Sequence, residues 1–562
     1  MDRNNVIQQL RDHPNVSVLI IGAGINGIGV FRDLARNGVD VLLVDRDDFC
    51  AGASSASSHM AHGGIRYLEN GEFRLVREAV QERNRLIVNA PHLVHPLPTV
   101  VPIFKIFSGL LNAPLKFLNL LNRPAERGAL VIKIGLMFYD AFTAGQKTVP
   151  PHILEGRQAS LQKYPKLNPQ IKYTARYYDG QILSPERLAV ELILDAEAES
   201  PYAKALNYVS LVGIHNGKVT LRDETNLQTF HLQPQLIINA TGPWIDPVNA
   251  TLGLSRHYIG GTKGSHLVLD HPELRQAIGA NEFFFENSDG RIVLIFPFHD
   301  KVLIGASDIP VESADDVRCT DEEIDYFLGM VARVFPGIAV RREQIVFQFS
   351  GVRPLAYASA NTAGQITRDH ILHEDHVDEI PVYSLVGGKW TTYRAFAEQV
   401  TDKVLTTLGH SRRATTGSLP VGGGRNYPQT ESAKGEFIQQ LAAKSGLTEE
   451  HAGRLFSRYG TRALEIAAFL HLQGQSDAPL LANPDYTRRE IQFLVAHEKA
   501  VHVDDLLLRR STLAWLGQAS LPLIAELAEI MGNTLGWTDE QKNIEAQRAA
   551  AILRDRHGVV LA

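Results

Sequence analysis

The stretch VSVLIIGAGINGIGVFRDLARNGVDVLLVD, residues 16–45, decides the fold of this chain. Val16–Ile21 is apolar apart from one serine, which is typical of a buried parallel strand. A G-x-G-x-x-G turn follows, and behind it apolar residues recur at helical spacing until Gly38. Val39–Val44 is a second apolar run that ends at Asp45. The order strand, glycine turn, helix and strand predicts a βαβ unit.

The spacing of the three glycines indicates that this unit binds a dinucleotide. Gly22 permits the tight turn, Gly24 lets the backbone approach a pyrophosphate, and Gly27 lets the helix pack closely on the strand. The helix start favours a bound phosphate, and Asp45 lies about where an acid accepts a hydrogen bond from a ribose hydroxyl. A purely structural glycine turn is the alternative. The motif alone does not distinguish NAD from FAD.

The composition excludes several other classes of protein. The chain has 562 residues, 44% of them hydrophobic and 21% charged, so we expect a globular protein with several lobes. A formal net charge of -6 gives no sign of nucleic-acid binding. Cys50 and Cys319 are the two cysteines, which excludes a disulfide framework and a cysteine-rich metal site, and we expect no metal. We also expect no signal peptide and no membrane-spanning segment, and a reduced, cytoplasmic location.

Three further stretches place small residues where backbone can line a flat ligand. Residues 49–68 read FCAGASSASSHMAHGGIRYL, in which Ser54 and Ser55 suit a ligand-lining loop as well as a solvated one. A short apolar strand ends in the turn ATG, residues 240–242, which alone is a common turn. Another apolar strand leads to the turn GGK, residues 387–389, and then to an amphipathic helix. This second strand–glycine–helix order is again typical of dinucleotide binding.

Residues 103–142 combine dense apolar positions with cations, and Glu126 is the only acid among residues 103–133. An apolar face edged by cations is what a helix lying in a membrane interface requires. A pair of helices that packs on the core is the alternative, and the residues leave both open. Pro114 and Pro124 interrupt the segment, so it does not span a bilayer.

Taken together, these motifs resemble those of the FAD-dependent glycerol-3-phosphate dehydrogenases, which belong to the D-amino-acid-oxidase-like flavoproteins. The matches follow the family's order over most of residues 15–405: IGAGINGIGVFRDLARNG, SSASSHMAHGGIRYLENGEFRLVREA, NATGPW, GTKGSHLVL, SGVRPL, ITRDH and GGKWTTYR. HGGIRYLE and GGKWTTYR are far more specific than the glycine motif. The C-terminal stretch VHVDDLLLRRSTLAWL resembles the family's cap domain.

We therefore expect an α/β fold with interleaved domains. A Rossmann-like FAD-binding domain is expected from residues 15–95, 170–260 and 341–408. A mixed antiparallel-sheet substrate and membrane-facing domain is expected from residues 96–169 and 261–340. A Gly-, Ser- and Pro-containing linker (residues 409–429) then leads to a C-terminal all-α domain (residues 430–562).

Position by position, the resemblance implies which residues hold FAD. The adenosine diphosphate half would contact Gly22, Gly24, Gly27, Asp45 and Arg46. The ribityl chain and flavin would be lined by Ser54, Ser55, His62, Gly63 and Gly64. A third strand end would contribute Ala240, Thr241 and Gly242. The pyrimidine side of the flavin would be covered by Gly388, Lys389, Thr391 and Thr392.

The family's substrate-site positions are matched by Arg66, Tyr67, His266, Arg353 and Lys389. Arg66 and Arg353 suit a phosphate, because a guanidinium can bind it bidentately. His266 is the candidate base, since the pKa of a histidine lies close to working pH, but the sequence leaves open whether His266 or Arg353 fills that role. Lys389 beside flavin N1 would stabilise the reduced flavin.

The expected reaction is the oxidation of sn-glycerol 3-phosphate to dihydroxyacetone phosphate, with hydride transfer to FAD and electrons passed to a respiratory quinone. We expect a peripheral protein on the inner face of the cell membrane, docked through residues 103–133, and leave a homodimer open. The alternatives are a glycerol-3-phosphate oxidase that uses oxygen and an amine or amino-acid oxidase of the same superfamily. An inert FAD-binding scaffold and an NAD-linked dehydrogenase are further alternatives.

Overall fold

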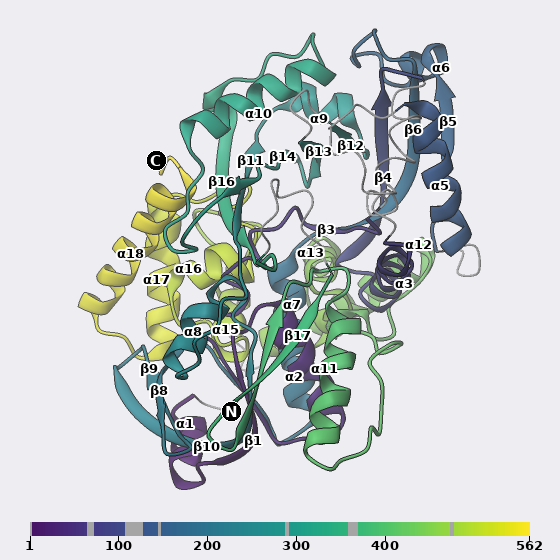
Figure 1. Cartoon of the computed structure of the whole chain (residues 1–562). Coiled ribbons are helices and arrows are strands. Elements are labelled where there is room, and N and C mark those ends of the chain that lie inside the picture. The colour runs from purple at the N-terminus through teal and green to yellow at the C-terminus, as the bar shows by residue number, and fades with distance from the viewer. Residues whose placement is uncertain are drawn as a thin grey trace.

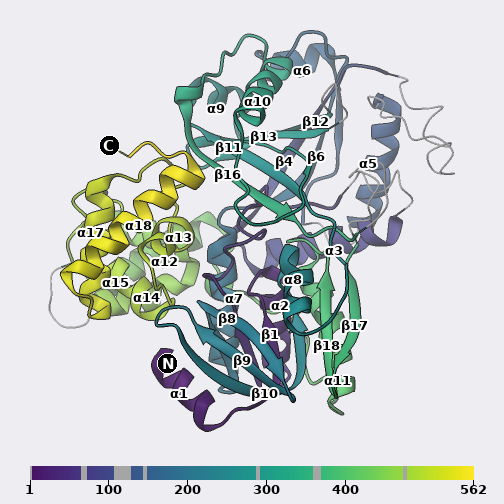
Figure 2. The same cartoon turned by 60° about the vertical axis from the view of Figure 1, so that its left-hand side comes forward.

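The computed structural model describes residues 3–64, 72–106, 128–143, 148–286, 291–357, 369–471 and 477–561. Two β-sheets form the body of the molecule, and the C-terminal helices pack beside both sheets (Figures 1 and 2). This arrangement confirms the expected α/β class with a C-terminal helical domain.

The first sheet contains the predicted βαβ unit. Its strands run in the order β17-β18-β10-β1-β2-β7, with bounds Ile371–Val377, Ile380–Val386, Gln228–Asn239, Asn15–Ile21, Val41–Val44 and Ala203–Leu206. β1 pairs in parallel with β2 and β10, and β10 pairs in parallel with β18. Helix α2 (Ile25–Arg36) joins β1 to β2. The carboxyl ends of β1, β2, β10 and β18 therefore meet at one edge of the sheet, where open α/β sheets bind ligands.

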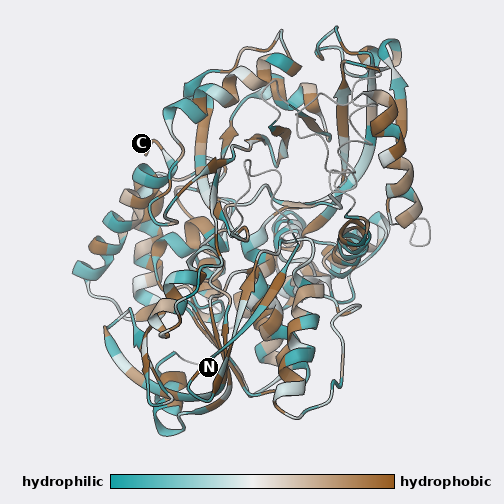
Figure 3. Cartoon of the chain, in the orientation of Figure 1, coloured by the Kyte–Doolittle hydropathy of each residue, from teal (hydrophilic) through white to brown (hydrophobic). Residues whose placement is uncertain are grey.

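Burial and capping explain these elements. Val18, Leu19 and Ile20 of β1 are fully buried, which matches the continuous apolar run. The first sheet is covered by α2, by α7 (Pro185–Glu199) and by α11 (Tyr393–Thr407), whose apolar side chains share one core. Ser184 caps α7 by accepting a hydrogen bond from the backbone of Arg187. The hydrophobic colour in Figure 3 follows these strands and helices.

Smaller elements complete the first sheet. A hairpin around Asn216 and Gly217 consists of β8 (Val209–His215) and β9 (Lys218–Asp223), and β9 pairs with β10. Helices α1 (Arg3–Asp12) and α8 (Ile245–Thr251) lie against this sheet.

The second sheet lies above the first in Figure 1. Its main path is β15-β11-β14-β13-β12-β4-β6-β3, while β16 pairs with β11 and β5 pairs with β6. In chain order, β3 to β6 span Met60–Ala61, Val94–Ile103, Ile153–Gly156 and Tyr173–Ile182. Strands β11 to β16 span Thr262–Leu269, Glu282–Glu286, Ile292–Phe298, Lys301–Gly305, Ile309–Pro310 and Ile345–Arg353. β6 and β16 fall in residue ranges expected for the FAD-binding domain, but both strands pair in this second sheet. The chain therefore passes between the two sheets more often than the expected ranges imply.

Five helices of the described residues flank the second sheet: α3 (Phe73–Asn89), α5 (Ala129–Thr143), α6 (Arg157–Lys163), α9 (Pro272–Ile278) and α10 (Asp321–Val334). Most of the predicted membrane-docking segment, residues 107–127, lies outside the described residues. Helix α5 follows it and exposes Leu130, Ile134, Met137 and Phe138. No helix among the described residues is long and apolar enough to cross a bilayer.

The C-terminal domain is helical, as expected. Its helices α12 to α15 span Glu431–Ser445, Glu449–Tyr459, Ala463–His471 and Arg488–His497. Helices α16 to α18 span Val503–Asp505, Leu521–Leu535 and Asp539–His557, and a π-helix covers Leu506–Arg510. The expected linker is packed at its end, because Gly422–Gly424 is buried and the Gly422 and Gly423 N–H groups donate to Asp195 and Glu191 of α7.

Candidate active site

A cavity of about 2030 Å³ lies between the two sheets and the C-terminal helices. It begins at the carboxyl ends of β1, β2 and β10 and reaches β11, β13 and β16 of the second sheet. Small-molecule pockets usually measure roughly 300–1,000 Å³, so this cavity has room for a dinucleotide and a second small molecule.

The glycine turn forms the floor of the cavity at the start of α2. Gly22 has φ +103°, and a Cβ there would lie 2.7 Å from the Ala240 backbone, so both the conformation and the space require glycine. Gly24 precedes α2 without a side-chain cap. A Cβ on Gly27 would lie 2.0 Å from the Gly22 carbonyl oxygen, which explains its packing role. Gly22 and Gly24 line the cavity, whereas Gly27 does not.

Asp45 lies beside the glycine turn, where the sequence predicts the ribose contact. Its Oδ2 accepts from the Ala23 N–H at 2.6 Å and its Oδ1 from the Asp47 N–H at 3.0 Å. Burial, with a contribution from the charge of Asp47, raises the pKa of Asp45 to about 7. Asp45 lines the cavity, so its carboxyl can accept a ligand hydroxyl there.

Arg46 lines the cavity at its rim, where its guanidinium contacts Trp244 and Asp315. Its guanidinium lies 4.6 Å from the centre of the Trp244 ring, and its Nη2 lies 3.2 Å from Asp315 Oδ1. Trp244 Nε1 also donates to Asp315 Oδ1 at 2.8 Å. The three side chains therefore form a surface cluster that joins the end of β2 to the loop before α10.

The loops that contain Ser54 and Gly387 are hydrogen-bonded to the start of α2, directly after the glycine turn. Ser54 Oγ accepts from the Ile25 N–H at 2.9 Å, and Asn26 Nδ2 donates to the Gly387 carbonyl at 3.0 Å. The Trp390 indole donates to the Ser54 carbonyl at 2.8 Å. Loops that are far apart in the sequence thus meet around the start of α2.

His266, on β11, lines the cavity with its ring stacked on Phe349 at a centroid distance of 4.8 Å. Its Nε2 lies 2.8 Å from Ser58 Oγ. A Cβ on Gly305 would lie 2.1 Å from His266 Cδ2, so the neighbouring strand must carry glycine. Burial and the charge of Arg353 hold the pKa of His266 well below its ordinary value. The premise that its pKa lies close to working pH is therefore wrong, and the imidazole is neutral.

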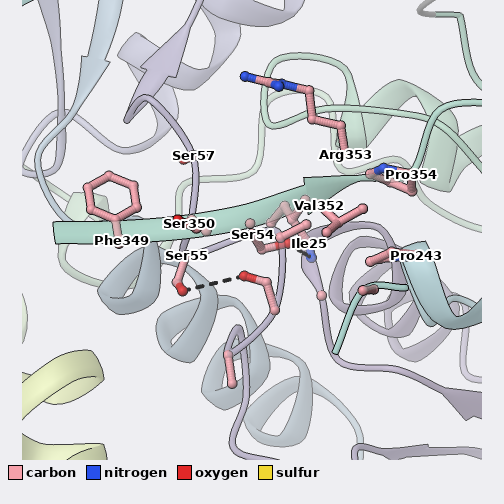
Figure 4. A pocket seen from close by; sticks show the side chains of 18 of the residues that line it. Ile25, Ser54, Ser55, Ser57, Pro243, Phe349, Ser350, Val352, Arg353 and Pro354 are labelled. Carbon is pink, nitrogen blue, oxygen red and sulfur yellow. Dashed lines mark hydrogen bonds between the residues drawn. The ribbon is translucent and has the colours of Figure 1, made fainter. Parts of the chain in front are cut away.

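Arg353 ends β16 and is half-buried at the cavity wall. Its Nη1 and Nη2 donate to the Ser307 carbonyl at 3.2 and 3.1 Å, and Nη1 also donates to Asp308 Oδ1 at 3.2 Å. A Cβ on Gly264 would lie 2.3 Å from Arg353 Nη2, so β11 makes room for the guanidinium. Figure 4 shows Phe349, Ser350 and Arg353 along β16, beside Ser54 and Ser55.

The structure brings most of the predicted site residues to this one cavity. Of the described candidates, the following line it: Gly22, Gly24, Asp45, Arg46, Ser54, Ser55, His62, Gly64, Ala240, Thr241, Gly242, His266, Arg353, Gly388, Lys389 and Thr391. Gly27, Gly63 and Thr392 are described but lie behind its surface. Arg66 and Tyr67 lie outside the described residues.

The C-terminal domain also lines the cavity, which the sequence did not indicate. Its lining residues are His502, Asp504, Leu508, Arg509, Trp515, Arg548, Ile552, Arg556 and His557. Arg510 Nη1 and Nη2 bind Asp48 at 2.7 and 2.9 Å, and Arg509 Nε binds it at 2.7 Å. Burial raises the pKa of Asp48, but the two arginine charges outweigh it and hold the pKa below its ordinary value. The adjacent arginines of the LLLRRS stretch were the only available signal, and an arginine pair in a helical run is usually solvated.

Comparisons with known proteins agree with this geometry. The family described as FAD dependent oxidoreductase matches residues 17–422, and the C-terminal domain of alpha-glycerophosphate oxidase matches residues 414–542. Glycerol-3-phosphate dehydrogenase of Synechocystis sp. is 34% identical, over 96% of this chain and 97% of that protein. D-erythritol 1-phosphate dehydrogenase of Brucella abortus is 31% identical, over 88% of this chain and 93% of that protein.

A solved structure has the same fold. The glycerol-3-phosphate dehydrogenase from Bacillus halodurans, complexed with FAD, has a TM-score of 0.74 at 22% identity, over 99% of this chain and 97% of that chain. A glycine turn, a dinucleotide-sized cavity and family matches that together reach from residue 17 to residue 542 lead to one conclusion. The chain belongs to the FAD dependent oxidoreductase family, and its residues 414–542 match the family described as the C-terminal domain of alpha-glycerophosphate oxidase.

Proposed function

We propose that this chain oxidises sn-glycerol 3-phosphate to dihydroxyacetone phosphate with FAD as its cofactor. The observation that carries the proposal is that His266, Arg353 and Lys389 line the same cavity as the glycine turn. Two cations and a neutral imidazole suit a substrate that is both a phosphate dianion and a secondary alcohol. The relatives named glycerol-3-phosphate dehydrogenase support the same substrate.

The residues present fit FAD. The glycine turn leaves no room for a Cβ at Gly22, and the first-turn N–H groups of α2 have no partners within the helix. We propose that Gly22, Gly24 and Asp45 hold the adenosine diphosphate half, and that His62, Gly64 and Gly388 lie against the flavin. Bound FAD supplies the acceptor for the two electrons of the substrate C2–H bond.

Arg353 is the proposed phosphate clamp. A guanidinium has five N–H donors in a rigid fork, so it can bind a phosphate while the Ser307 carbonyl fixes its plane. Its half-buried position strengthens the interaction relative to one in bulk water. We propose that Arg66 assists it, as the resemblance implies.

His266 is the proposed base for the C2 hydroxyl. Its neutral imidazole is the form that accepts a proton, and the contact with Ser58 Oγ fixes the ring. Burial and Arg353 disfavour the resulting imidazolium, while the substrate's phosphate dianion offsets that cost. The proton therefore moves only with a phosphorylated substrate bound. Lys389 is proposed to stabilise the negative charge of the reduced flavin, and Tyr67 to contact the substrate.

We further propose a respiratory quinone as the electron acceptor and peripheral docking on the inner face of the cell membrane. The exposed apolar side chains of α5 support docking: Leu130, Ile134, Met137 and Phe138 are 40, 46, 57 and 47% exposed. An apolar helix face of this kind buries itself in the headgroup boundary. Flotation with anionic liposomes tests this proposal, and a protein that stays at the bottom of the gradient contradicts it. A homodimer remains a proposal that sedimentation can test.

The substrate is tested by steady-state oxidation with an artificial electron acceptor. We expect turnover of glycerol 3-phosphate and none of glycerol, sarcosine or D-amino acids, because these lack the phosphate that Arg353 binds. D-erythritol 1-phosphate is a second candidate substrate, since a relative 31% identical carries that name. If kcat/KM is higher for D-erythritol 1-phosphate than for glycerol 3-phosphate, D-erythritol 1-phosphate is the preferred substrate. Turnover of sarcosine or D-amino acids alone would overturn the proposal.

A further inference from the structure

The turn formed by His62, Gly63 and Gly64 is held from two sides. On one side, Thr391 Oγ1 accepts from the His62 N–H at 3.0 Å and donates to the His62 carbonyl at 3.1 Å. On the other side, the Gly63 N–H donates to Asp179 Oδ1 at 2.9 Å. His62 and Gly64 line the cavity, while Gly63 faces away from it. The position of the turn therefore depends on the residues that contact Gly63 on the side away from the cavity.

Behind Gly63 lies a buried polar cluster made by three elements. Tyr139 of α5 donates its hydroxyl to Asp179 of β6, and its oxygen lies 3.2 Å from the Gly63 nitrogen. Arg83 of α3 donates through Nη1 to Tyr139 Oη at 2.8 Å and to the Tyr178 carbonyl at 2.6 Å. The exposed fractions of Arg83, Tyr139 and Asp179 are 0, 2 and 2%.

Sterics set the distance between the turn and the cluster. A Cβ on Gly63 would lie 2.3 Å from Tyr139 Oη and 2.6 Å from its ring, so the ring packs directly on the glycine. Polar groups buried this deeply are costly unless bonded, so the cluster is stable only when all its hydrogen bonds form. The Gly63 N–H is one of those bonds, and the turn and the cluster must move together.

We propose that Tyr139 and Asp179 are positioning residues, which set the His62–Gly64 turn against the cofactor through the Gly63 N–H. The inference rests on the proposed function, because it takes this turn to border the flavin. Tyr139 and Arg83 do not line the cavity, whereas Asp179 does, so Tyr139→Phe is the variant that isolates the positioning effect. Its effect is geometric: a displacement of about 1 Å in a reacting pair can cost roughly 100-fold in rate.

The test compares Tyr139→Phe and Asp179→Asn with Tyr383→Phe as a matched control. Tyr383 is also a buried tyrosine, its hydroxyl lies 2.7 Å from Thr407 Oγ1, and it does not line the cavity. The measurement is the rate of anaerobic flavin reduction by glycerol 3-phosphate in stopped flow, normalised to bound FAD. We expect both cluster variants to lose roughly ten- to 100-fold in the limiting rate. The half-saturating substrate concentration should change less than about threefold, since the clamp is intact.

The visible spectrum of bound FAD gives a readout that a purely structural role would not move. We expect the flavin bands of folded Tyr139→Phe to shift relative to wild type, while those of Tyr383→Phe stay in place. A wild-type limiting rate and spectrum in both cluster variants would overturn the inference.

Two further measurements keep the outcomes separable. If the cluster variants do not fold, hydrogen exchange of the wild-type peptide that contains Gly63 decides: slow exchange supports the inference, and exchange at the rate of an open loop overturns it. If glycerol 3-phosphate fails to reduce the flavin of the wild type, the proposed substrate fails. The spectral shift and hydrogen exchange then still test the position of the turn.

Discussion

At the scale of single residues, Arg353 carries the proposed substrate recognition. The loop carbonyl of Ser307 holds its guanidinium at the cavity wall, and Gly264 leaves room for it. We expect Arg353→Ala to lower kcat/KM for glycerol 3-phosphate by about 2 kcal/mol or more, roughly 30-fold, mainly through KM. Arg342→Ala is the control, because Arg342 pairs with Asp321 and Asp325 at the surface. Steady-state kinetics at matched FAD content measure both variants, and an unchanged Arg353→Ala would remove this residue from the site.

Glu282, at the start of β12, gives a pH-dependent prediction. It is 0% exposed, and Thr99 Oγ1 donates to its Oε2 at 2.7 Å. Burial raises the pKa of Glu282 from 4.5 to about 8. Between these values the folded chain holds a proton that the unfolded chain has lost, so stability falls as pH rises through this window.

Glutamine at position 282 should remove this loss of stability. Between pH 5 and pH 8 the variant Glu282→Gln should become more stable relative to wild type, by on the order of a few kcal/mol in unfolding free energy. The measurement is the Tm of Glu282→Gln minus that of wild type, which is expected to rise over this pH range. Glu273→Gln is the control, since Glu273 pairs with Lys166 at the surface and should change stability by less than about 0.5 kcal/mol. A Tm difference that stays flat or falls with pH would show that Glu282 is not protonated in the fold.

Sequence reasoning reached the residues whose position at the cavity follows from backbone geometry. Gly22, Gly24 and Asp45 were predictable because a glycine turn between a strand and a helix has one arrangement. Tyr139 and Asp48 were not, because their roles depend on partners that are distant in the sequence. The low pKa of His266 was also hidden, since only the fold reveals its burial and the nearby Arg353.

At the scale of elements, a buried ion pair joins α11 to α3. Arg394 Nε and Nη2 bind the two carboxylate oxygens of Glu82 at 2.6 and 2.8 Å. We expect Arg394→Ala to destabilise the protein by about 1–3 kcal/mol, because the buried Glu82 carboxylate loses its bidentate partner and keeps only its pair with Arg85. Chemical denaturation measures the change, with Arg342→Ala at an exposed ion pair as the comparison. Equal small losses in both variants would contradict the special role of the buried pair.

Elements with strong local signals can be predicted from the sequence, whereas the sheet that a strand joins cannot. The cap of α7 at Ser184 and the turn at Asn216 and Gly217 are written in a few adjacent residues. β6 and β16 carry no such signal for the sheet that they join, because their partners β4 and β11 are remote in the chain. The sequence predicted a linker over a range that includes Gly422–Gly424, but these glycines are buried. Glycines suit close packing as well as flexible linkers, so the sequence alone does not distinguish the two.

At the scale of the whole molecule, the C-terminal domain closes the cavity that the two sheets form. Asp48, directly after the glycine-turn unit, is fully enclosed by Arg509 and Arg510. We expect Asp48→Ala to lower Tm and to weaken FAD binding at least tenfold, because buried Arg510 loses its carboxylate partner and Arg509 keeps only Asp504 and Asp505, beside the loop that holds Asp45. Thermal unfolding and FAD titration of the apoprotein measure the two effects. A variant that keeps wild-type FAD affinity would show that domain docking and cofactor binding are independent.

The central claim is that one cavity holds FAD beneath cations that recognise a phosphorylated alcohol. The most direct measurement is anaerobic titration of the purified yellow protein with glycerol 3-phosphate, followed by absorbance of the flavin. We predict complete bleaching at close to one substrate per flavin, with glycerol leaving the spectrum unchanged. A flavin that glycerol 3-phosphate does not bleach, or a protein that purifies without flavin, would contradict the account.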